Sequence, residues 1–402
     1  MAGRLSWGLA DQAVSSLTNF AVSSYVARSL GVAAFGVFSL ALVTYGVALN
    51  VSRGLATDPL MVRFSGVSEQ SWRRAVSRAT GTAIGVGAAA GAACLLLGVA
   101  IGGAAGHAFA GLGVVLPALL SQDSWRFAFF AAGKGRKAFL NDLVWAVVLV
   151  PAMVLADHQG SVTAFVLAWG LSAAVAAGFG YLQTGIAPGV GAARRWLREQ
   201  RDLAPRYLLE NVSNSGASQV RMYGLGAIAG LAAVGTVRGA ELLLGPFLAV
   251  LMGLSLVTVA EASRVVRKAP HRLARFCLFL GGSQAAAAAL WGLGLLLLLP
   301  DGLGEFVLGS VWPTASELIL PATLAVVGAS FTTGAQAGLR ALAAARRSMP
   351  TQVLTSCCYV AGGLAGALSA GAVGSAWGVA VATSTGAAIW WLQLRSALKE
   401  LT

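Results

Sequence analysis

The sequence has few charged residues and few of the residues that usually carry catalysis. Only 11% of its 402 residues are charged, whereas soluble domains carry roughly 25%. A surface so poor in charge cannot face water, which excludes a soluble globular protein. The three histidines and four cysteines lack the spacing of a metal site or a disulfide framework. We therefore expect no catalytic residue, no metal site and no cofactor.

Long apolar stretches are abundant, and hydrophobic residues make up 57% of the chain. About 20 such residues span the hydrocarbon core of a bilayer. The pattern predicts an all-α polytopic membrane protein with about twelve transmembrane helices. The predicted spans are 7–27, 34–52, 79–101, 109–132, 141–156, 162–182, 207–228, 235–256, 276–299, 317–339, 351–370 and 375–393.

The net charge of +13 does not indicate nucleic acid, because the basic residues are placed as they are in membrane proteins. Nearly all lie in alternate segments between the predicted spans, and Arg28 is the one basic residue expected in the opposite set. Basic residues concentrate on the cytoplasmic side of membrane proteins. The alternation therefore predicts that both termini are cytoplasmic, and it supports an even number of spans.

The chain repeats itself weakly at an offset of 199 residues. Residues 31–36 read GVAAFG and residues 230–235 read GLAAVG. Parallel repeats of six helices are related by an axis along the membrane normal. We predict an N-terminal six-helix lobe at 1–182, a C-terminal lobe at 207–402, and between them a basic amphipathic linker at 183–206. Arg194, Trp196 and neighbouring arginines predict that this linker lies on anionic lipid.

Two helices at equivalent positions in the repeat each carry a polar stripe. A polar stripe in a membrane is costly unless it faces protein or a water-filled cavity, so the pair predicts a central cavity between the lobes. Simple helix-to-helix hydrogen bonding is the alternative. The stripes consist of Asp11, Ser15 and Asn19 in the first helix and of Glu210, Asn214 and Ser218 in the seventh.

Few charges lie within the predicted spans. Asp123 precedes Arg126 by three residues, and Arg238 precedes Glu241 by three, so each pair can meet on one helical turn. These pairs are expected to be structural clasps or functional groups. Arg221 has no acidic neighbour three or four residues away. It is therefore predicted to face a ligand or water.

Several stretches resemble the polysaccharide and lipid-linked oligosaccharide flippases of the multidrug/oligosaccharidyl-lipid/polysaccharide (MOP) exporter superfamily. The likeness covers nearly the whole chain with loose motifs. The stretches are ARSLG at 27–31 with Phe35-Gly36, Asp58-Pro59-Leu60, FFAAGKGRKAFLND at 129–142, GAELLLGP at 239–246, and GLRALAAARRS at 338–348.

This resemblance implies two lobes around a cationic cavity. The implied function is to move a lipid-linked anionic glycan from the cytoplasmic to the outer leaflet of a bacterial plasma (inner) membrane by alternating access. The implied partners are membrane lipids, a polysaccharide polymerase and glycosyltransferases. Arg28, Arg53, Arg221 and Arg238 would by this resemblance contact the pyrophosphate. From their positions in the sequence, Asp11, Glu210 and Glu241 are expected to line the cavity or couple an ion, and Asp11 and Glu210 could instead merely balance the arginines.

Other functions stay open at this point. A multidrug exporter or a major-facilitator transporter of small solutes would also have two lobes. A multidrug exporter of cations would need carboxylates in the cavity, and segment 53–74 lacks the acidic–Arg–x–Gly–Arg–Arg pattern of major facilitators. A membrane-embedded polysaccharide polymerase or ligase would need a sizeable outward loop with catalytic residues. The longest outward loop, 300–316, is short and acidic, so we expect that the protein is not an enzyme.

Overall fold

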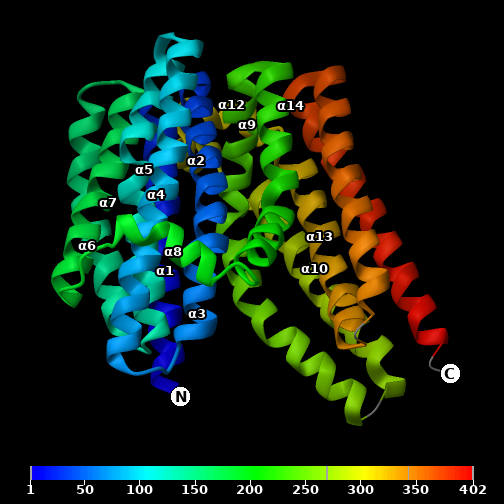
Figure 1. Cartoon of the computed structure of the whole chain (residues 1–402). Helices are drawn as coiled ribbons and strands as arrows, with labels where there is room; N and C mark the ends of the chain where they lie inside the picture. The colour runs from blue at the N-terminus through cyan, green and yellow to red at the C-terminus, as the bar shows by residue number, and fades with distance from the viewer. Residues whose placement is uncertain (1, 269, 343, 401–402) are drawn as a thin grey trace. The chain divides into compact units, whose positions relative to one another are not determined.

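The computed structural model describes residues 2–268, 270–342 and 344–400, and the described residues form helices and no strands (Figure 1). Long apolar helices satisfy their own backbone hydrogen bonds, which suits them to lipid. The longer helices are α1 (Ala2–Ser29), α2 (Val32–Ser52), α4 (Glu69–Ile101), α5 (Gly103–Ala131), α6 (Gly135–Asp157), α7 (Val162–Thr184), α9 (Ala204–Lys268), α10 (Leu273–Leu298), α13 (Ile319–Ala341) and α14 (Ala345–Lys399). The shorter elements are η1 (Arg53–Thr57), α3 (Asp58–Phe64), η2 (Val190–Ala192), α8 (Ala193–Glu199), η3 (Pro270–Arg272), α11 (Asp301–Leu308), η4 (Gly309–Val311) and α12 (Trp312–Ser316).

Two of these helices are broken, and the breaks account for the predicted number of spans. In α9, Gly230 has φ of 83° and ψ of 173°, and in α14, Gly371 has φ of 58°. Such angles are readily adopted only by glycine. With α9 and α14 counted twice, and α1, α2, α4, α5, α6, α7, α10 and α13 once, the helices match the twelve predicted spans. The predicted fold class is confirmed.

Among the described residues, nine helical stretches are long and apolar enough to cross a membrane. This number is lower than twelve because a broken helix counts as one stretch, and because α1 is not among the nine. Its polar residues Asp11, Ser15 and Asn19 lower its hydropathy. The chain is therefore a multi-pass membrane protein in which α1 is too polar to meet the hydropathy limit that the nine stretches meet.

The contacts divide the chain into two compact units. The N-terminal unit comprises Met1–Leu30 and Val37–Gln219, and the C-terminal unit comprises Gly31–Gly36 and Val220–Thr402. This division falls inside α9, whereas the predicted lobes meet at a linker over 183–206. The first part of α9 joins the N-terminal unit because Asn211 donates to Asp58 and Asn50 donates to Ser215.

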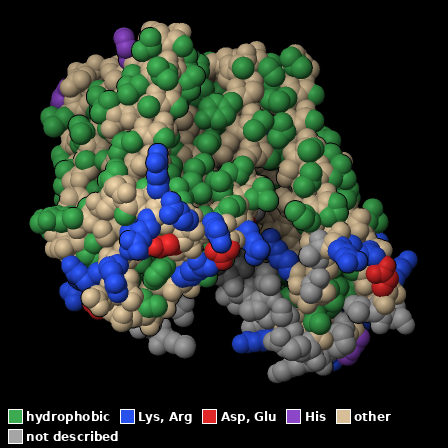
Figure 2. Space-filling view, in the orientation of Figure 1, with side chains coloured by type: hydrophobic (Ala, Val, Ile, Leu, Met, Phe, Trp, Pro, Cys, Tyr) green, Lys and Arg blue, Asp and Glu red, His purple; other side chains and the backbone are tan. Residues whose placement is uncertain are grey.

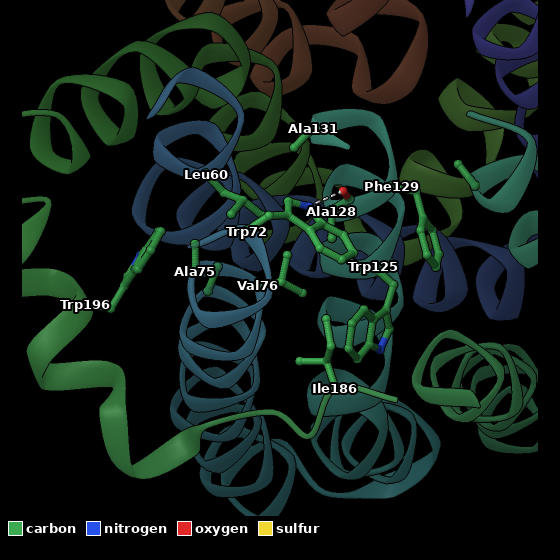
Figure 3. Packing of buried hydrophobic residues seen from close by; sticks show 12 residues of the cluster. Leu60, Trp72, Ala75, Val76, Trp125, Ala128, Phe129, Ala131, Ile186 and Trp196 are labelled. Carbon is green, nitrogen blue, oxygen red and sulfur yellow. Dashed lines mark hydrogen bonds between the residues drawn. The ribbon is translucent and has the colours of Figure 1, made fainter. Parts of the chain in front are cut away.

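The linker packs on the N-terminal unit, and its tryptophan is not exposed to lipid. Trp196 is fully buried in a cluster at one end of the unit (Figure 3). Its Nε1 donates to the Leu55 carbonyl at 3.0 Å, and its ring lies 5.7 Å from that of Phe64. Trp196 therefore does not face lipid, and the expected contact of the linker with anionic lipid would have to be made by its exposed arginines. The indole anchors the linker to protein, because a buried indole needs both an apolar surround and an acceptor for its N–H.

Helices within each unit approach closely at glycines. A Cβ on Gly91 of α4 would lie 2.4 Å from the Gly113 carbonyl of α5, and a Cβ on Gly366 would lie 2.0 Å from the Gly374 carbonyl across the break in α14. No larger residue fits at such distances without movement of the backbone. Small residues at helix interfaces let helix backbones approach this closely.

Glycines of the internal repeat meet in a reciprocal contact within the C-terminal unit. A Cβ on Gly36 would lie 1.8 Å from the Leu231 carbonyl oxygen, and a Cβ on Gly235 would lie 2.1 Å from the Val32 carbonyl oxygen. Residues 32 and 231, like 36 and 235, are equivalent at the offset of 199. The two copies therefore make the same contact in both directions, which is the signature of a local two-fold axis.

We expect Gly36→Ala to destabilise the protein by about 1–3 kcal/mol, the usual cost of forcing atoms into a packed site. The added methyl group must push the backbone of Leu231 away. Gly31→Ala is the matched control, because a Cβ there meets nothing within 4 Å. Thermal unfolding in detergent would measure both variants. Equal melting temperatures for the two would show that the close contact is not tightly packed.

Candidate functional site

The N-terminal unit contains a group of ionised side chains within its interior, here called the N-terminal ion cluster. Its five members come from four segments: Asp11 from α1, Arg53 from η1, Asp123 and Arg126 from α5, and Asp142 from α6. The helices that supply them pack against one another, α1 on α6 and α5 on α6 and α7 (Figure 1).

Arg126 lies between two carboxylates at the centre of this cluster. Its Nη2 is 2.5 Å from Asp11 Oδ2, and its Nε is 3.5 Å from Asp142 Oδ2. Asp11 is fully buried and Asp142 nearly so. The predicted clasp between Asp123 and Arg126 is wrong, because the guanidinium of Arg126 is directed toward α1 and α6, away from its neighbour on the same turn.

Asp123 pairs with Arg53 instead. Arg53 Nε donates to Asp123 Oδ2 at 3.1 Å and Nη2 donates to Oδ1 at 2.6 Å, which is the two-pronged geometry of a strong guanidinium–carboxylate pair. The guanidinium also lies 5.0 Å from the ring centroid of Phe127. Arg53 opens the π-helical turn η1, and such turns occur often at functional sites.

Neutral polar side chains hold the cluster in place. Gln122 donates to Asp142 Oδ1 at 2.8 Å, and Asn141 donates to the Ala176 carbonyl at 2.8 Å, which ties α6 to α7. Asn141 and Asp142 were not predicted as site residues. The sequence signal for them is their position as two adjacent polar residues at the start of the predicted span 141–156.

The charges of the N-terminal ion cluster do not balance. Three carboxylates, of Asp11, Asp123 and Asp142, face two guanidinium groups, of Arg53 and Arg126. In addition, the buried Asp11 Oδ1 has no hydrogen-bond partner among the described residues. A buried, unbalanced carboxylate is costly. The cluster therefore has the charge and a free oxygen that a proton or a small cation would satisfy.

The C-terminal unit contains a second group, here called the C-terminal ion cluster, made of Arg221, Arg238 and Glu241. Arg221 Nη2 lies 2.5 Å from Glu241 Oε1, and Arg238 Nη1 lies 2.9 Å from Oε2. The predicted Arg238–Glu241 clasp is therefore present, with Arg221 as an additional partner. The break at Gly230 lets α9 reverse so that Arg221 can reach a residue 20 positions later.

Arg221 is buried and paired, so the expectation of an unpaired cation that faces ligand or water is wrong. Its side chain is 4% exposed, whereas the side chain of Arg238 is 35% exposed. The guanidinium of Arg221 lies 5.4 Å from the ring centroid of Tyr359. Sequence spacing predicts ion pairs only within one helical turn. The partner of Arg221 was not predicted because it lies beyond the helix break at Gly230.

The remaining predicted residues occupy varied positions. Arg28 is exposed in the last turn of α1, Asn19, Glu210 and Ser218 are exposed, and Ser15 is half-buried. The side chain of Asn214 lies outside the described residues. Asp11 is buried while its repeat partner Glu210 is exposed, so the two polar stripes are not equivalent. Asp11 is expected to act within the ion cluster and not as an open cavity wall.

Solved structures with the same fold are transporters of the MOP superfamily. An inward-facing multidrug resistance MATE family transporter of that superfamily aligns with 96% of this chain and 95% of its own, at 16% identity and a TM-score of 0.66. The lipid II flippase MurJ in an inward closed conformation aligns with 98% of this chain and 87% of its own, at 12% identity and a TM-score of 0.64. These two likenesses show that the chain has the fold of these transporters, as the resemblance predicted. No protein-family model and no curated protein matches the sequence.

Proposed function

We propose that the protein is a membrane flippase that moves a lipid-linked oligosaccharide, a polyprenyl-pyrophosphate glycan, from the cytoplasmic to the outer leaflet by alternating access. The fold supports membrane transport as the class of function, and one protein with this fold is a lipid II flippase. The observation that carries the choice of substrate is the excess positive charge of the C-terminal ion cluster.

Arg238 carries the part of this excess positive charge that a substrate can reach. One carboxylate, Glu241, serves both Arg238 and the buried Arg221. Arg238 donates to it through Nη1 alone, and its side chain is partly exposed. The Nε and Nη2 edge has no hydrogen-bond partner among the described residues. That edge can bind a phosphate in two-pronged fashion, as guanidinium groups do.

Arg53 and Arg28 are proposed as further contacts with the pyrophosphate. Arg53 is paired with Asp123 but keeps part of its side chain exposed, and Arg28 is exposed at the end of α1. Arg221 is not included, because its guanidinium is covered by protein.

We place both termini in the cytoplasm of a bacterial cell from the distribution of basic residues. Glycosyltransferases and a polysaccharide polymerase are the proposed functional partners.

A multidrug exporter is the second candidate, since another protein with this fold has that activity. A cationic drug would need carboxylates that a bulky molecule can reach, yet Asp11, Asp123 and Asp142 of the N-terminal unit are buried and contact Arg126 and Arg53. This arrangement favours an anionic substrate. We propose that the unbalanced carboxylate of the N-terminal ion cluster instead holds the proton or sodium ion that drives transport.

Arg238→Ala is expected to reduce flipping of a fluorescent polyprenyl-pyrophosphate oligosaccharide in reconstituted vesicles at least tenfold. A partly exposed arginine can be removed with little loss of stability, so the melting temperature should stay close to that of the wild type. Arg238→Lys should also be impaired, because a point charge cannot reproduce the two-pronged contact.

The control for this experiment is Arg275→Ala, which removes an exposed arginine at the start of α10 in the same unit. That variant should flip the substrate normally. A cationic dye should not be exported by the wild type. Normal flipping by Arg238→Ala would reject Arg238 as a substrate contact, and export of the dye in place of the glycan would favour the multidrug alternative.

A further inference from the structure

The basic end of the N-terminal unit contains a pocket built by the linker and α4. Figure 2 shows Lys and Arg side chains gathered at one end of this unit, while hydrophobic side chains cover much of the rest of that face. The pocket has a volume of about 380 Å³, within the roughly 300–1,000 Å³ usual for small-ligand sites. Its lining consists of Arg73, Arg74, Ser77, Arg78, Gly185, Ile186, Ala187 and Ala192.

The linker is fixed on α4, so the pocket has a defined shape. Ser77 Oγ donates to the Ala187 carbonyl at 2.7 Å, and Gly189 N donates to the Ser77 carbonyl at 2.7 Å. Two buried side chains of the linker also fix it to the unit. Ile186 and Trp196 both insert into the buried cluster shown in Figure 3. A segment anchored on both sides keeps its backbone in place without a ligand.

Arg73 contributes a positive charge that pairs with no carboxylate in the described part of the chain. Its Nη1 donates to the Thr184 carbonyl at 2.8 Å and its Nη2 to the Gly185 carbonyl at 3.1 Å. Backbone carbonyls orient the guanidinium but carry no net charge. The positive charge therefore remains at the edge of the pocket.

The other arginines near the pocket also exceed their acidic partners. Arg78 and Arg195 both pair with Glu199. Arg74 is exposed and forms no hydrogen bond or ion pair with any described residue, and Arg194 beside Arg195 is likewise exposed. Among the described residues, Glu199 is thus the one carboxylate that pairs with these arginines. The positive charge of this surface is complementary to a phosphate group.

An apolar surface borders the pocket, which distinguishes a lipid from a soluble anion. The last turn of α7 leads directly into Gly185, and there Tyr181 is 47% exposed and Leu182 is 75% exposed. Val190 of the linker is also exposed. Aromatic and apolar residues beside arginines are typical of the boundary between headgroups and acyl chains. A ligand with a phosphate and hydrocarbon chains satisfies both surfaces at once.

We propose that this pocket, here called the basic pocket, binds the headgroup of an anionic phospholipid, with the phosphate at Arg74 and the acyl chains along the end of α7. This site differs from the expected surface contact of the linker, because Trp196 of the linker is buried and the site is an open pocket between the linker and α4. Lipid binding there does not depend on which substrate the protein transports.

The test measures binding of phosphatidylglycerol to the full-length protein in detergent by native mass spectrometry, with phosphatidylcholine as the comparison lipid. Arg74→Ala should weaken phosphatidylglycerol binding about fivefold, since one basic residue near an anionic surface contributes about a factor of five. Arg136→Ala is the matched control. It removes one exposed arginine from the same unit outside the pocket and should bind as the wild type does.

Three results of these measurements would contradict lipid binding at the basic pocket. Equal loss in Arg74→Ala and Arg136→Ala would show a general effect of charge and would overturn the pocket. Binding of glycerol phosphate that competes fully at the lipid's concentration would overturn the lipid as the occupant and leave a soluble anion. Because Arg74 forms no hydrogen bond or ion pair with the described residues, its variant should melt like the wild type in phosphatidylcholine, and a lower melting temperature would assign Arg74 a structural role instead.

Discussion

Arg126→Met is expected to lower the free energy of unfolding by about 3–5 kcal/mol, the range found when one partner of a buried ion pair is removed. The guanidinium of Arg126 is the only group with which Asp11 forms an ion pair among the described residues, and it also contacts Asp142. Both carboxylates are buried. Methionine fills much of the same volume, so the loss reports the charges and not a cavity.

The matched variants follow from the charge of the N-terminal ion cluster. Asp142→Asn removes one of three negative charges that face two positive charges, so it should destabilise far less than Arg126→Met. Combining Arg126→Met with Asp142→Asn should recover part of the loss. Melting temperatures in detergent would compare the three. If Asp142→Asn were the most destabilising of them, the excess negative charge inferred for this cluster would be wrong.

The same variants bear on how transport is driven. If the unbalanced carboxylate holds a proton, Asp142→Asn should make flipping insensitive to a pH gradient across reconstituted vesicles, because a neutral amide neither gains nor loses the proton. A variant that stays folded and still responds to the gradient would exclude Asp142 as the coupling group. If flipping by the wild type responded to a sodium gradient and not to a pH gradient, the N-terminal ion cluster would be assigned to sodium.

The fold was largely predictable from the sequence because the bilayer imposes a simple rule. Apolar stretches of about 20 residues mark the spans, and the positions of both broken helices were predicted as pairs of spans, 207–228 with 235–256 and 351–370 with 375–393. The repeat GVAAFG and GLAAVG also predicted a two-fold relation, and the reciprocal contacts of Gly36 and Gly235 agree with it. These features depend on local composition, which a single sequence shows.

The pairing of charges was not predictable to the same degree, because ion partners are chosen by tertiary packing. Asp123 and Arg126 are neighbours on one helical turn, yet each pairs with a residue from another segment. Spacing identifies which charges lie within the membrane, and it identified Asp11, Arg126 and Glu241. Arg53 was predicted as a site residue from the family resemblance alone. Spacing does not identify partners that are 70 or 115 positions apart. The missed Asp142 belongs to this class.

Glu241→Ala is expected to be the most destabilising change in the C-terminal ion cluster, with a loss of about 3–5 kcal/mol. Glu241 is the shared partner of both arginines, and Arg221 is the buried one. Without the carboxylate, the covered guanidinium of Arg221 keeps Tyr359 as its remaining partner among the described residues, and attraction to that ring is worth roughly 0.5–2 kcal/mol. Arg238 can turn toward water or substrate, so its own loss of the carboxylate costs little.

The three members of this cluster should therefore rank in a fixed order. Arg221→Met should cost less than Glu241→Ala, because Glu241 keeps Arg238 as its partner and no buried charge is left alone. Combining Arg221→Met with Glu241→Gln should recover most of the stability lost in Glu241→Ala, since neither buried position then carries a charge. Unfolding curves in detergent would establish the order. A larger loss in Arg221→Met than in Glu241→Ala would contradict it, and would mean that Arg238 does not hold Glu241 once Arg221 is gone.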